Sequence, residues 1–213
     1  MSTKMKKFCY MLLGILLIGI CVASFRMSGF GVDPFTCMNL GISKFIHMGF
    51  GTWQLMVNAV LLILVFFTVR HCIGLGTVVN MVGVGYIADF LCWVMEDIVH
   101  LQMNWGLRIL MLAIGLLFAS LGAAMYMTAD MGIAPYDSVA FIIEKFSKGK
   151  IAFQYGRVCS DVIVMAVGVG FCAASGNSIF LVVGLGTLLN SMFNGPLIQF
   201  FRSRMEKTMG EEA

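Results

Sequence analysis

Two copies of one seven-residue pattern decide how this chain is expected to fold. Residues 74–80 read GLGTVVN, and residues 184–190 read GLGTLLN. In each copy a Gly-Leu-Gly-Thr start is followed by two aliphatic residues and an asparagine. Recurrence over a long period indicates two copies of one structural unit. We therefore expect a duplicated fold.

The flanking residues extend the repeat in both directions. A Gly-x-x-Pro segment recurs with an offset of 101 residues, whereas the GLGT pattern recurs with an offset of 110, so the second copy carries a net insertion between them. The two copies are expected to cover residues 1–103 and 104–213. The paired positions are Gly31 with Gly132, Pro34 with Pro135, Gly74 with Gly184, Gly76 with Gly186, Thr77 with Thr187 and Asn80 with Asn190.

The composition predicts a membrane protein. Of the 213 residues, 60% are hydrophobic and only 12% are charged, whereas a soluble domain carries about 25% charged residues. A bilayer core of roughly 30 Å needs about 20 apolar residues per helix. We therefore expect an all-α polytopic protein in a lipid bilayer with about six transmembrane helices. The expected spans are Phe8–Arg26, Thr52–Val69, Ile73–Val94, Leu107–Met127, Ile151–Ala173 and Ser178–Phe201.

A short helix is expected after each Gly-x-x-Pro break. Glycine tolerates positive φ and can end one helix, while proline, which lacks an N–H, suits the first turn of the next. The segments Pro34–Ile46 and Pro135–Phe146 carry several polar residues and are short for a span. They could be amphipathic interfacial helices, which we favour, or re-entrant helices buried against protein. Asp33 and Asp137 flank the breaks and are candidate caps.

Three spans in each copy would insert the second copy upside down. Such inverted repeats place a binding site near the membrane midplane. Cytoplasmic termini in a bacterial inner membrane would satisfy the positive-inside rule. If both short segments also spanned, the repeats would be parallel and the charges would fit almost as well; segment length favours six spans. The expected cytoplasmic cations are Lys4, Lys6, Lys7, Arg70, Lys145, Lys148, Lys150, Arg202, Arg204 and Lys207, against Arg26, Lys44 and Arg108 outside.

The repeated glycines and asparagines allow two interpretations each. An open helix start at the GLGT glycines could bind an anion through free N–H groups, but close packing of small residues is favoured. Asn80 and Asn190 could hold the bundle together, worth roughly 0.6–2 kcal/mol, or line a polar cavity.

Charged residues inside the spans are stronger candidates for a functional site, because placing a carboxylate at the bilayer centre costs about 2.5–3.5 kcal/mol. Asp161 follows Arg157 by four residues, a spacing that predicts an ion pair. Asp89 has no local cation. It is a candidate for proton or cation coupling if it is buried, and an interfacial residue otherwise. The expected substrate-binding residues are Asn80, Asp89, Asn190, Asn194, Gln199, Asp161 and Arg157.

The stretches MGIAPYDSVAFIIEKFS (131–147) and GLGTLLNSMFNGPLIQFF (184–201) together resemble the YczE/YyaS-type bacterial integral membrane proteins, distant relatives of the YitT group. Gly132, Pro135 and Asp137 match the first family pattern, and the second is matched by Gly186, Thr187, Asn190, Gly195 and Pro196. Gln199 stands where the family more often has an acid, whereas Asp89 keeps the acid in the first copy. The resemblance implies a membrane protein, described at most as a transport permease.

We expect a small-solute transporter, with the substrate bound between the repeats and a homodimer possible. The alternatives are a solute-capture subunit of a multi-component importer and a non-transporting scaffold or regulator. The seven cysteines show no CxxC, and the chain contains no HExxH or GxSxG. No enzyme activity, cofactor, metal or nucleic-acid partner is expected.

Overall fold

A computed structural model describes residues 3–48, 50–175 and 183–211, which form helices and connecting turns. No strand occurs in these ranges, so the predicted all-α fold is confirmed. The elements are α1 (Thr3–Ser28), α2 (Pro34–Phe45), α3 (Phe50–Thr68), the 3-10 turn η1 (Arg70–Cys72), α4 (Leu75–Trp93), the π-helical turn η2 (Val94–Ile98), α5 (Trp105–Thr128), α6 (Ser138–Phe146), α7 (Phe153–Ala174) and α8 (Leu185–Glu211).

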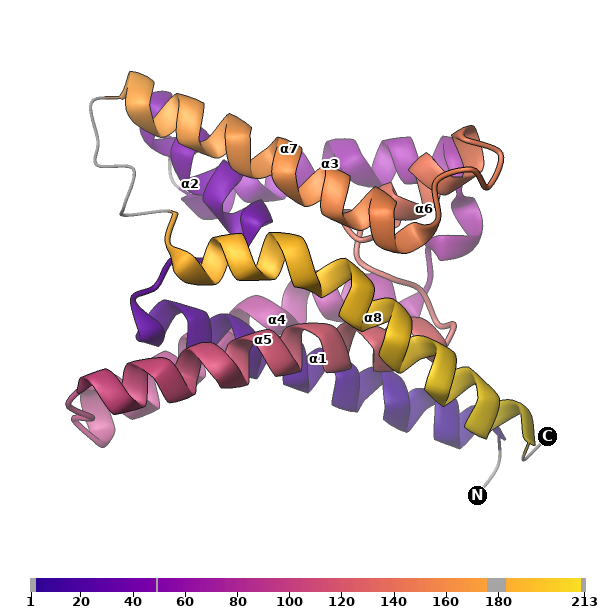
Figure 1. Ribbon diagram of the computed structural model, residues 1–213, viewed down its shortest axis with the longest axis horizontal. Helices are drawn as coiled ribbons and strands as arrows, with labels where there is room; N and C mark the ends of the chain where they lie inside the picture. The colour runs from indigo at the N-terminus through magenta and orange to yellow at the C-terminus, as the bar shows by residue number, and fades with distance from the viewer. Residues whose placement is uncertain (1–2, 49, 176–182, 212–213) are drawn as a thin grey trace.

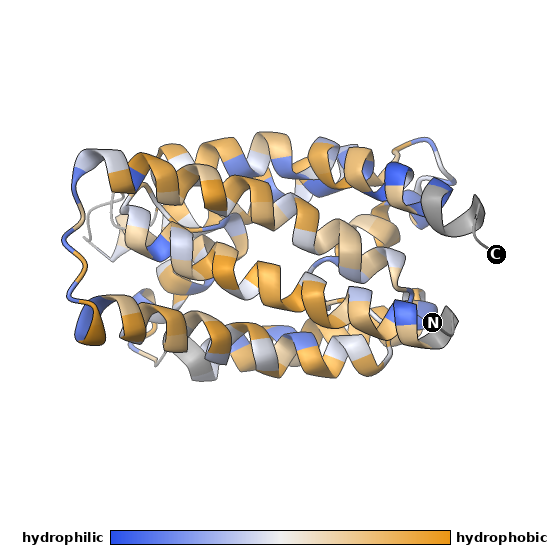
Figure 2. Cartoon of the chain, turned by 90° about the horizontal axis from the view of Figure 1, so that it is seen from below, coloured by the Kyte–Doolittle hydropathy of each residue, from blue (hydrophilic) through white to orange (hydrophobic). Residues whose placement is uncertain are grey.

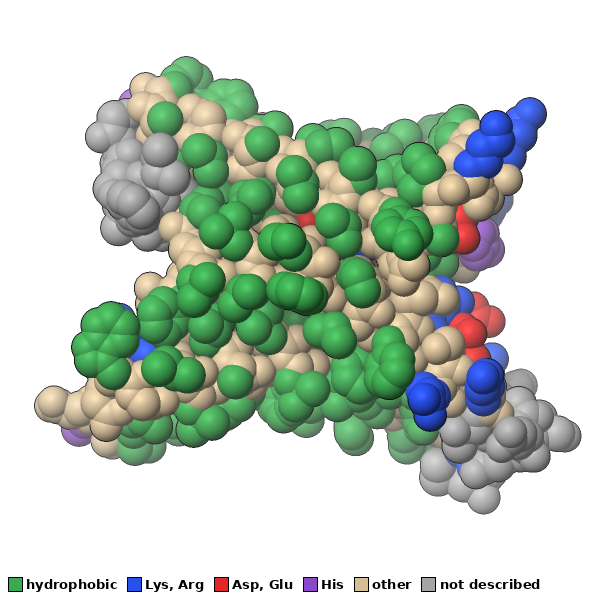
Figure 3. Space-filling view, in the orientation of Figure 1, with side chains coloured by type: hydrophobic (Ala, Val, Ile, Leu, Met, Phe, Trp, Pro, Cys, Tyr) green, Lys and Arg blue, Asp and Glu red, His purple; other side chains and the backbone are tan. Residues whose placement is uncertain are grey.

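Five of the long helices begin and end within five residues of the expected spans, whereas α8 ends ten residues beyond the expected Phe201. Four of them are long and apolar enough to cross a membrane: α1, α4 continued by η2, α5 and α7. The apolar part of α3, Thr52–Thr68, is shorter. The expected sixth span, Ser178–Phe201, begins in residues outside the described ranges, and its described part belongs to α8. Most residues along the helices are hydrophobic (Figure 2), and apolar side chains are spread over the face seen in Figure 3.

The helices lie in two groups with α8 between them (Figure 1). One group contains α1, which packs on α5 and α4; the other contains α7, which packs on α2 and α6. Close approach depends on glycine. A Cβ at Gly14 of α1 would lie 2.7 Å from the carbonyl oxygen of Gly122 on α5, and a Cβ at Gly122 would lie 2.8 Å from that of Gly14. Small residues at such crossings are typical of helices in membranes.

The two Gly-x-x-Pro breaks contain the expected left-handed glycines, with φ of 95° at Gly31 and 101° at Gly132. In the first break Asp33 caps α2 as predicted, because Thr36 N donates to Asp33 Oδ1 over 3.0 Å. The helix that follows is buried against α7, and its residue Asn39 is 0% exposed. In the second break α6 begins only at Ser138, three residues after the proline.

Each GLGT helix start is hydrogen-bonded to the Gly-x-x-Pro segment of the other copy. Gly76 N donates to Met131 O over 2.7 Å, and Gly186 N donates to Phe30 O over 2.8 Å. The glycines leave no room for side chains: a Cβ at Gly132 would collide with the backbone of Gly74, and one at Gly31 with that of Gly184. Close packing therefore explains these glycines better than an open anion-binding helix start does.

The GLGT threonines complete the same contacts. Thr77 Oγ1 accepts from Gly74 N over 3.1 Å, and Thr187 Oγ1 accepts from Gly184 N over 3.3 Å. Thr187 also donates across the copies to Val32 O, over 2.6 Å. Both threonine side chains are thereby used by the backbone that surrounds them.

Candidate functional site: a buried charged cluster

The first turns of α7 carry an ion pair inside the bundle. Arg157 Nε lies 3.3 Å from Asp161 Oδ2, one helical turn further on, which confirms the predicted pair. The side chains are only 9% and 0% exposed, respectively. Asp161 lies eight residues, or about 12 Å, beyond the first residue of α7. The pair is therefore inside the helix that is apolar enough to span, not at its end.

A second carboxylate shares the same guanidinium. Arg157 Nη1 contacts Asp137 Oδ1, and the hydroxyl of Tyr126 on α5 donates to Asp137 Oδ2. Asp137 was expected to cap the short helix. That expectation is wrong for its side chain, which makes no cap hydrogen bond. The carboxylate pairs instead with the guanidinium, which carries a full positive charge, whereas a backbone N–H is a neutral donor.

Tyr136 joins the cluster to the first copy of the repeat. Its hydroxyl donates to Asp161 Oδ1 over 2.5 Å, and its ring lies under the Arg157 guanidinium, 4.7 Å from Cζ to the ring centroid. Phe35 of α2 stacks on the same ring at 4.4 Å. Burial, with the neighbouring Asp161 carboxylate, raises the pKa of the Tyr136 hydroxyl, so the hydroxyl remains a donor at neutral pH.

Helix α8 packs beside the cluster with a polar, buried side. Gly195 allows the approach, since a Cβ there would lie 3.1 Å from Arg157 Cβ. The neighbouring Asn194 accepts a hydrogen bond from Ser120 of α5 over 3.1 Å. Asn190, one turn earlier on α8, is 3% exposed, and its Oδ1 has no hydrogen-bond donor. Four of the expected site residues, Arg157, Asp161, Asn190 and Asn194, thus lie on the adjoining helices α7 and α8 up to Gly195, and Gln199 lies further along α8.

The remaining expected site residues lie elsewhere or are not described. Asn80 is buried on α4, which packs on α1. Gln199 is half-buried on α8, beyond Gly195. Asp89 belongs to α4, but its side chain falls outside the described part of the structure. Tyr126, Tyr136 and the pairing role of Asp137 were not identified from the sequence. The Tyr-Asp dipeptide directly after Pro135 is a sequence feature that points to Tyr136 and Asp137.

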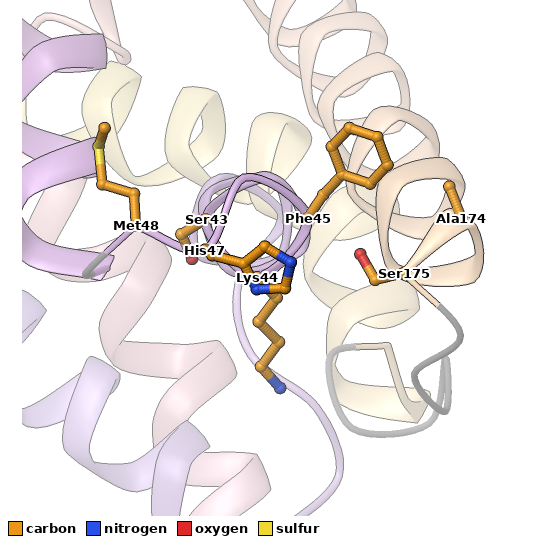
Figure 4. Close-up of a pocket in the computed structure, with 7 residues that line it drawn as sticks. All are labelled: Ser43, Lys44, Phe45, His47, Met48, Ala174 and Ser175. Carbon is orange, nitrogen blue, oxygen red and sulfur yellow. The ribbon is translucent and has the colours of Figure 1, made fainter.

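A pocket lies at the opposite end of α7 from the cluster (Figure 4). It has a volume of about 670 Å³ and lies between the end of α2 and the last turn of α7. Ala174 is thirteen residues, or about 20 Å, beyond Asp161. The hydroxyls of Ser43 and Ser175 already donate to carbonyls of their own helices. We place the candidate site at the charged cluster, because it unites charged and hydrogen-bonding side chains from three segments: α5, the α5–α6 connection and α7. The pocket-lining residues are Ser43, Lys44, Phe45, His47, Met48, Ala174 and Ser175.

Among the described residues, no group of His, Cys, Asp and Glu has the arrangement of a metal site. The cluster consists of one guanidinium, two carboxylates and two phenol hydroxyls. With both acids ionised its net charge is −1. It can therefore hold a positive charge or exchange a proton, chemistry that intramembrane acids commonly serve.

The apolar helices and the buried ionic cluster define a polytopic α-helical membrane protein. The chain belongs to a family of unknown function, DUF6198, whose model matches residues 5–203. This bears out the resemblance to the YczE/YyaS-type proteins.

Three relatives are similar along most of their length. "Uncharacterized protein YyaS" of Bacillus subtilis (strain 168) is 28% identical over 204 residues, 94% of either chain. An "Uncharacterized protein" of Haemophilus influenzae is 24% identical, covering 94% of this chain and 85% of its own. "Uncharacterized membrane protein YczE" of Bacillus subtilis (strain 168) is 19% identical, covering 85% and 81%. No solved structure matches the chain.

Proposed function

We propose that the chain is a small-solute transporter built from two inverted three-helix repeats, with its binding site at the Arg157 cluster. Six spans would then be α1, α3 and α4 in the first repeat and α5, α7 and α8 in the second. The short helices α2 and α6 would enter the bilayer as re-entrant segments, since α2 is covered by α7 and not spread along a surface.

The exchange of equivalent contacts supports the repeat. The GLGT start of each copy receives a carbonyl from the break of the other, through Gly76 with Met131 and Gly186 with Phe30. Two-fold symmetry relates such a reciprocal pair of contacts. In secondary transporters, inverted repeats of this kind surround a site that is formed by interrupted helices.

The observation that carries the proposal is the meeting of both breaks at one set of buried charges. Phe35 from the first break stacks on Tyr136 from the second, and Tyr136 bonds to Asp161. Ionisable residues inside spans are costly, and they commonly mark solute or ion pathways. A non-transporting scaffold would need well-packed side chains at this position, but it would not need a buried cluster with a net charge.

The distribution of basic residues supports cytoplasmic termini in a bacterial inner membrane. Both termini lie at the same end of the molecule (Figure 1), where Lys and Arg also gather in Figure 3. The loop between α5 and α6 reaches that end too, since Lys7 lies 3.9 Å from Asp130. The positive-inside rule assigns this end to the cytoplasm.

A solute screen tests the proposal. The full chain in detergent is heated with each member of a solute library, and a ligand at a hundred times its Kd should stabilise it by about 2.7 kcal/mol. Hits are then assayed for flux in proteoliposomes. Arg157→Gln should abolish stabilisation and flux. Arg202→Gln is the matched control, because it breaks an ion pair of the same i,i+4 spacing that is more exposed.

The outcomes separate the three candidate functions. Stabilisation with flux, both lost in Arg157→Gln, supports a transporter with this site. Stabilisation without flux would favour a solute-capture subunit. Failure of the whole library to stabilise the protein would favour a scaffold or regulator.

A further inference from the structure

The cluster has one more carboxylate than its guanidinium neutralises. Arg157 contacts both Asp137 and Asp161. Asp33 adds a third negative charge within electrostatic range of Asp161. The positive ends of α2, α6 and α7 supply about +0.5 each, which offsets only part of the charge that Arg157 leaves. Negative charge therefore remains unbalanced in the interior of the bundle.

Two of the helices packed on α7 each carry a buried amide oxygen that receives no hydrogen bond. Asn39 Oδ1 on α2 and Asn190 Oδ1 on α8 are buried without a donor. Asn39 lies one turn from Phe35, which stacks on Tyr136, and α8 approaches Arg157 at Gly195. Buried polar atoms are nearly always paired. The helices around the cluster thus offer acceptors without donors, and the cluster carries an excess of negative charge; a bound proton would reduce that excess.

We propose that the cluster binds one proton, carried by Asp161, and that this proton is the coupling ion of transport. The role of this proton in coupling rests on the transporter function proposed above. In the binding step a hydronium ion gives its proton to a carboxylate oxygen of Asp161 and leaves as water. An O–H bond forms, the cluster charge changes from −1 to 0, and Arg157 stays paired with Asp137.

Asp161 is the better proton acceptor of the two. Its side chain is 0% exposed, against 14% for Asp137, so its ionised form is the more poorly solvated. Its contact with Arg157, at 3.3 Å, is long for a charge-assisted hydrogen bond, which is usually about 2.7–2.9 Å. The hydrogen-bond part of this contact is therefore weak, although the Arg157 charge and the Tyr136 hydroxyl, 2.5 Å from Asp161 Oδ1, still favour the ionised form.

Charged and titratable groups reach Asp161 from several elements. Arg157 lies on its own helix, Tyr136 and Asp137 come from the segment between α5 and α6, and Asp33 lies at the start of α2. From α8, the buried Asn190 and Asn194 are uncharged. Protonation of Asp161 should therefore depend on Asp137, because without it Arg157 would neutralise Asp161 alone.

Infrared spectroscopy of the full chain in lipid nanodiscs tests the proton site. On acidification from mildly alkaline to mildly acidic pH, the wild type should gain the carbonyl band of a protonated, buried carboxyl group. The band should vanish in Asp161→Asn and return, shifted, in Asp161→Glu. Asp137→Asn should also lose it, although Asp161 is then still present. Asp130→Asn is the control and should keep the band, since the Asp130 side chain is 80% exposed.

A wild type without this band over that range would overturn the proposal, and so would a band that persists in Asp161→Asn. The measurement needs no solute, so its outcome is separate from that of the transporter. A band that depends on Asp137 and Asp161, found with no flux of any solute, would support the proton site and sink only the transport function. Solute flux without the band would support the transport function and overturn the proton site.

Discussion

The two Gly-x-x-Pro segments share a backbone but differ in their side-chain chemistry. Both use a left-handed glycine, and both close on the GLGT start of the other copy. In the first copy the acid precedes the proline, and Asp33 caps α2. In the second the acid follows the proline by two residues, and Asp137 turns to Arg157 and Tyr126.

The aromatic residues around the two breaks also differ: those at the second break carry hydroxyl groups, and those at the first do not. Tyr126 has Phe25 as its counterpart, 101 residues earlier, and Tyr136 has Phe35. Both first-copy rings are apolar, and Phe25 is only 1% exposed. The two breaks thus share one backbone pattern, while the ionic side chains gather at the second break only. This division can be tested by changing each copy in turn.

The largest loss of unfolding free energy is expected for a substitution at Arg157. Arg157→Leu removes the cation that both buried carboxylates contact, and breaking a buried ion pair from one side typically costs about 3–5 kcal/mol. Denaturant or thermal unfolding in a mild detergent measures the loss. Val57 lies three residues after Gln54, as Arg157 does after Gln154. Val57→Ala should cost less than about 1.5 kcal/mol; comparable losses for the two changes would remove the proposed asymmetry.

The scaffold glycines should be sensitive in both copies. Alanine at Gly31 or Gly132 would take a left-handed φ and collide with the facing helix start. Strain and overpacking each cost about 1–3 kcal/mol, so a loss of about 2–4 kcal/mol is expected for either variant. The unfolding free energies of the two variants, measured under the same conditions, should agree closely. A large effect in one and none in the other would show that the breaks are not equivalent.

A smaller effect is expected when the second copy is made to resemble the first. Tyr126→Phe removes the hydroxyl that donates to Asp137, and a hydrogen bond to a charged group contributes about 1.5–3 kcal/mol. The reverse change, Phe25→Tyr, buries a new hydroxyl without an assigned partner and should also destabilise. Unfolding free energies of both variants check this, and a stabilising Tyr126→Phe would contradict the hydrogen bond.

The smallest effect is expected at the cap. Asp33→Ala removes the side chain that accepts from Thr36 N, which typically costs about 1 kcal/mol. Helix protection measured by hydrogen exchange should fall at the first turn of α2. Asp137→Ala should leave the first turn of α6 unchanged by this mechanism, because no cap bond exists there. Equal fraying of the two helices would contradict the comparison.

Much of the scaffold could be predicted because it depends on local patterns. Apolar runs located the long helices, and glycine with proline located both breaks. The i,i+4 spacing of Arg157 and Asp161 likewise predicted their pair, since both residues lie on one helix. The roles of the GLGT glycines could not be decided locally, because their partners are carbonyls about 55 and 156 residues away along the chain.

The rest of the site depends on contacts between helices. Asp137 has the sequence position of a cap, and only the arrival of α7 makes Arg157 its partner. The stack of Phe35 on Tyr136 joins residues that the repeat makes equivalent, but equivalence in sequence does not place two rings together. Asn80 and Asn190 show the same limit: the pattern that pairs them does not say that only Asn190 lies on a helix beside the cluster.

The crossed hydrogen bonds at the GLGT starts have a consequence for biosynthesis. When the ribosome has made only the first copy, the Gly76 amide has not yet met its acceptor, because Met131 is still to be synthesised. An unpaired backbone amide in the bilayer is costly. The helices α1, α3 and α4 therefore cannot complete their contacts until the second half of the chain follows. Made as two separate polypeptides, the halves should each be short-lived in the cell and should persist only when they are produced together.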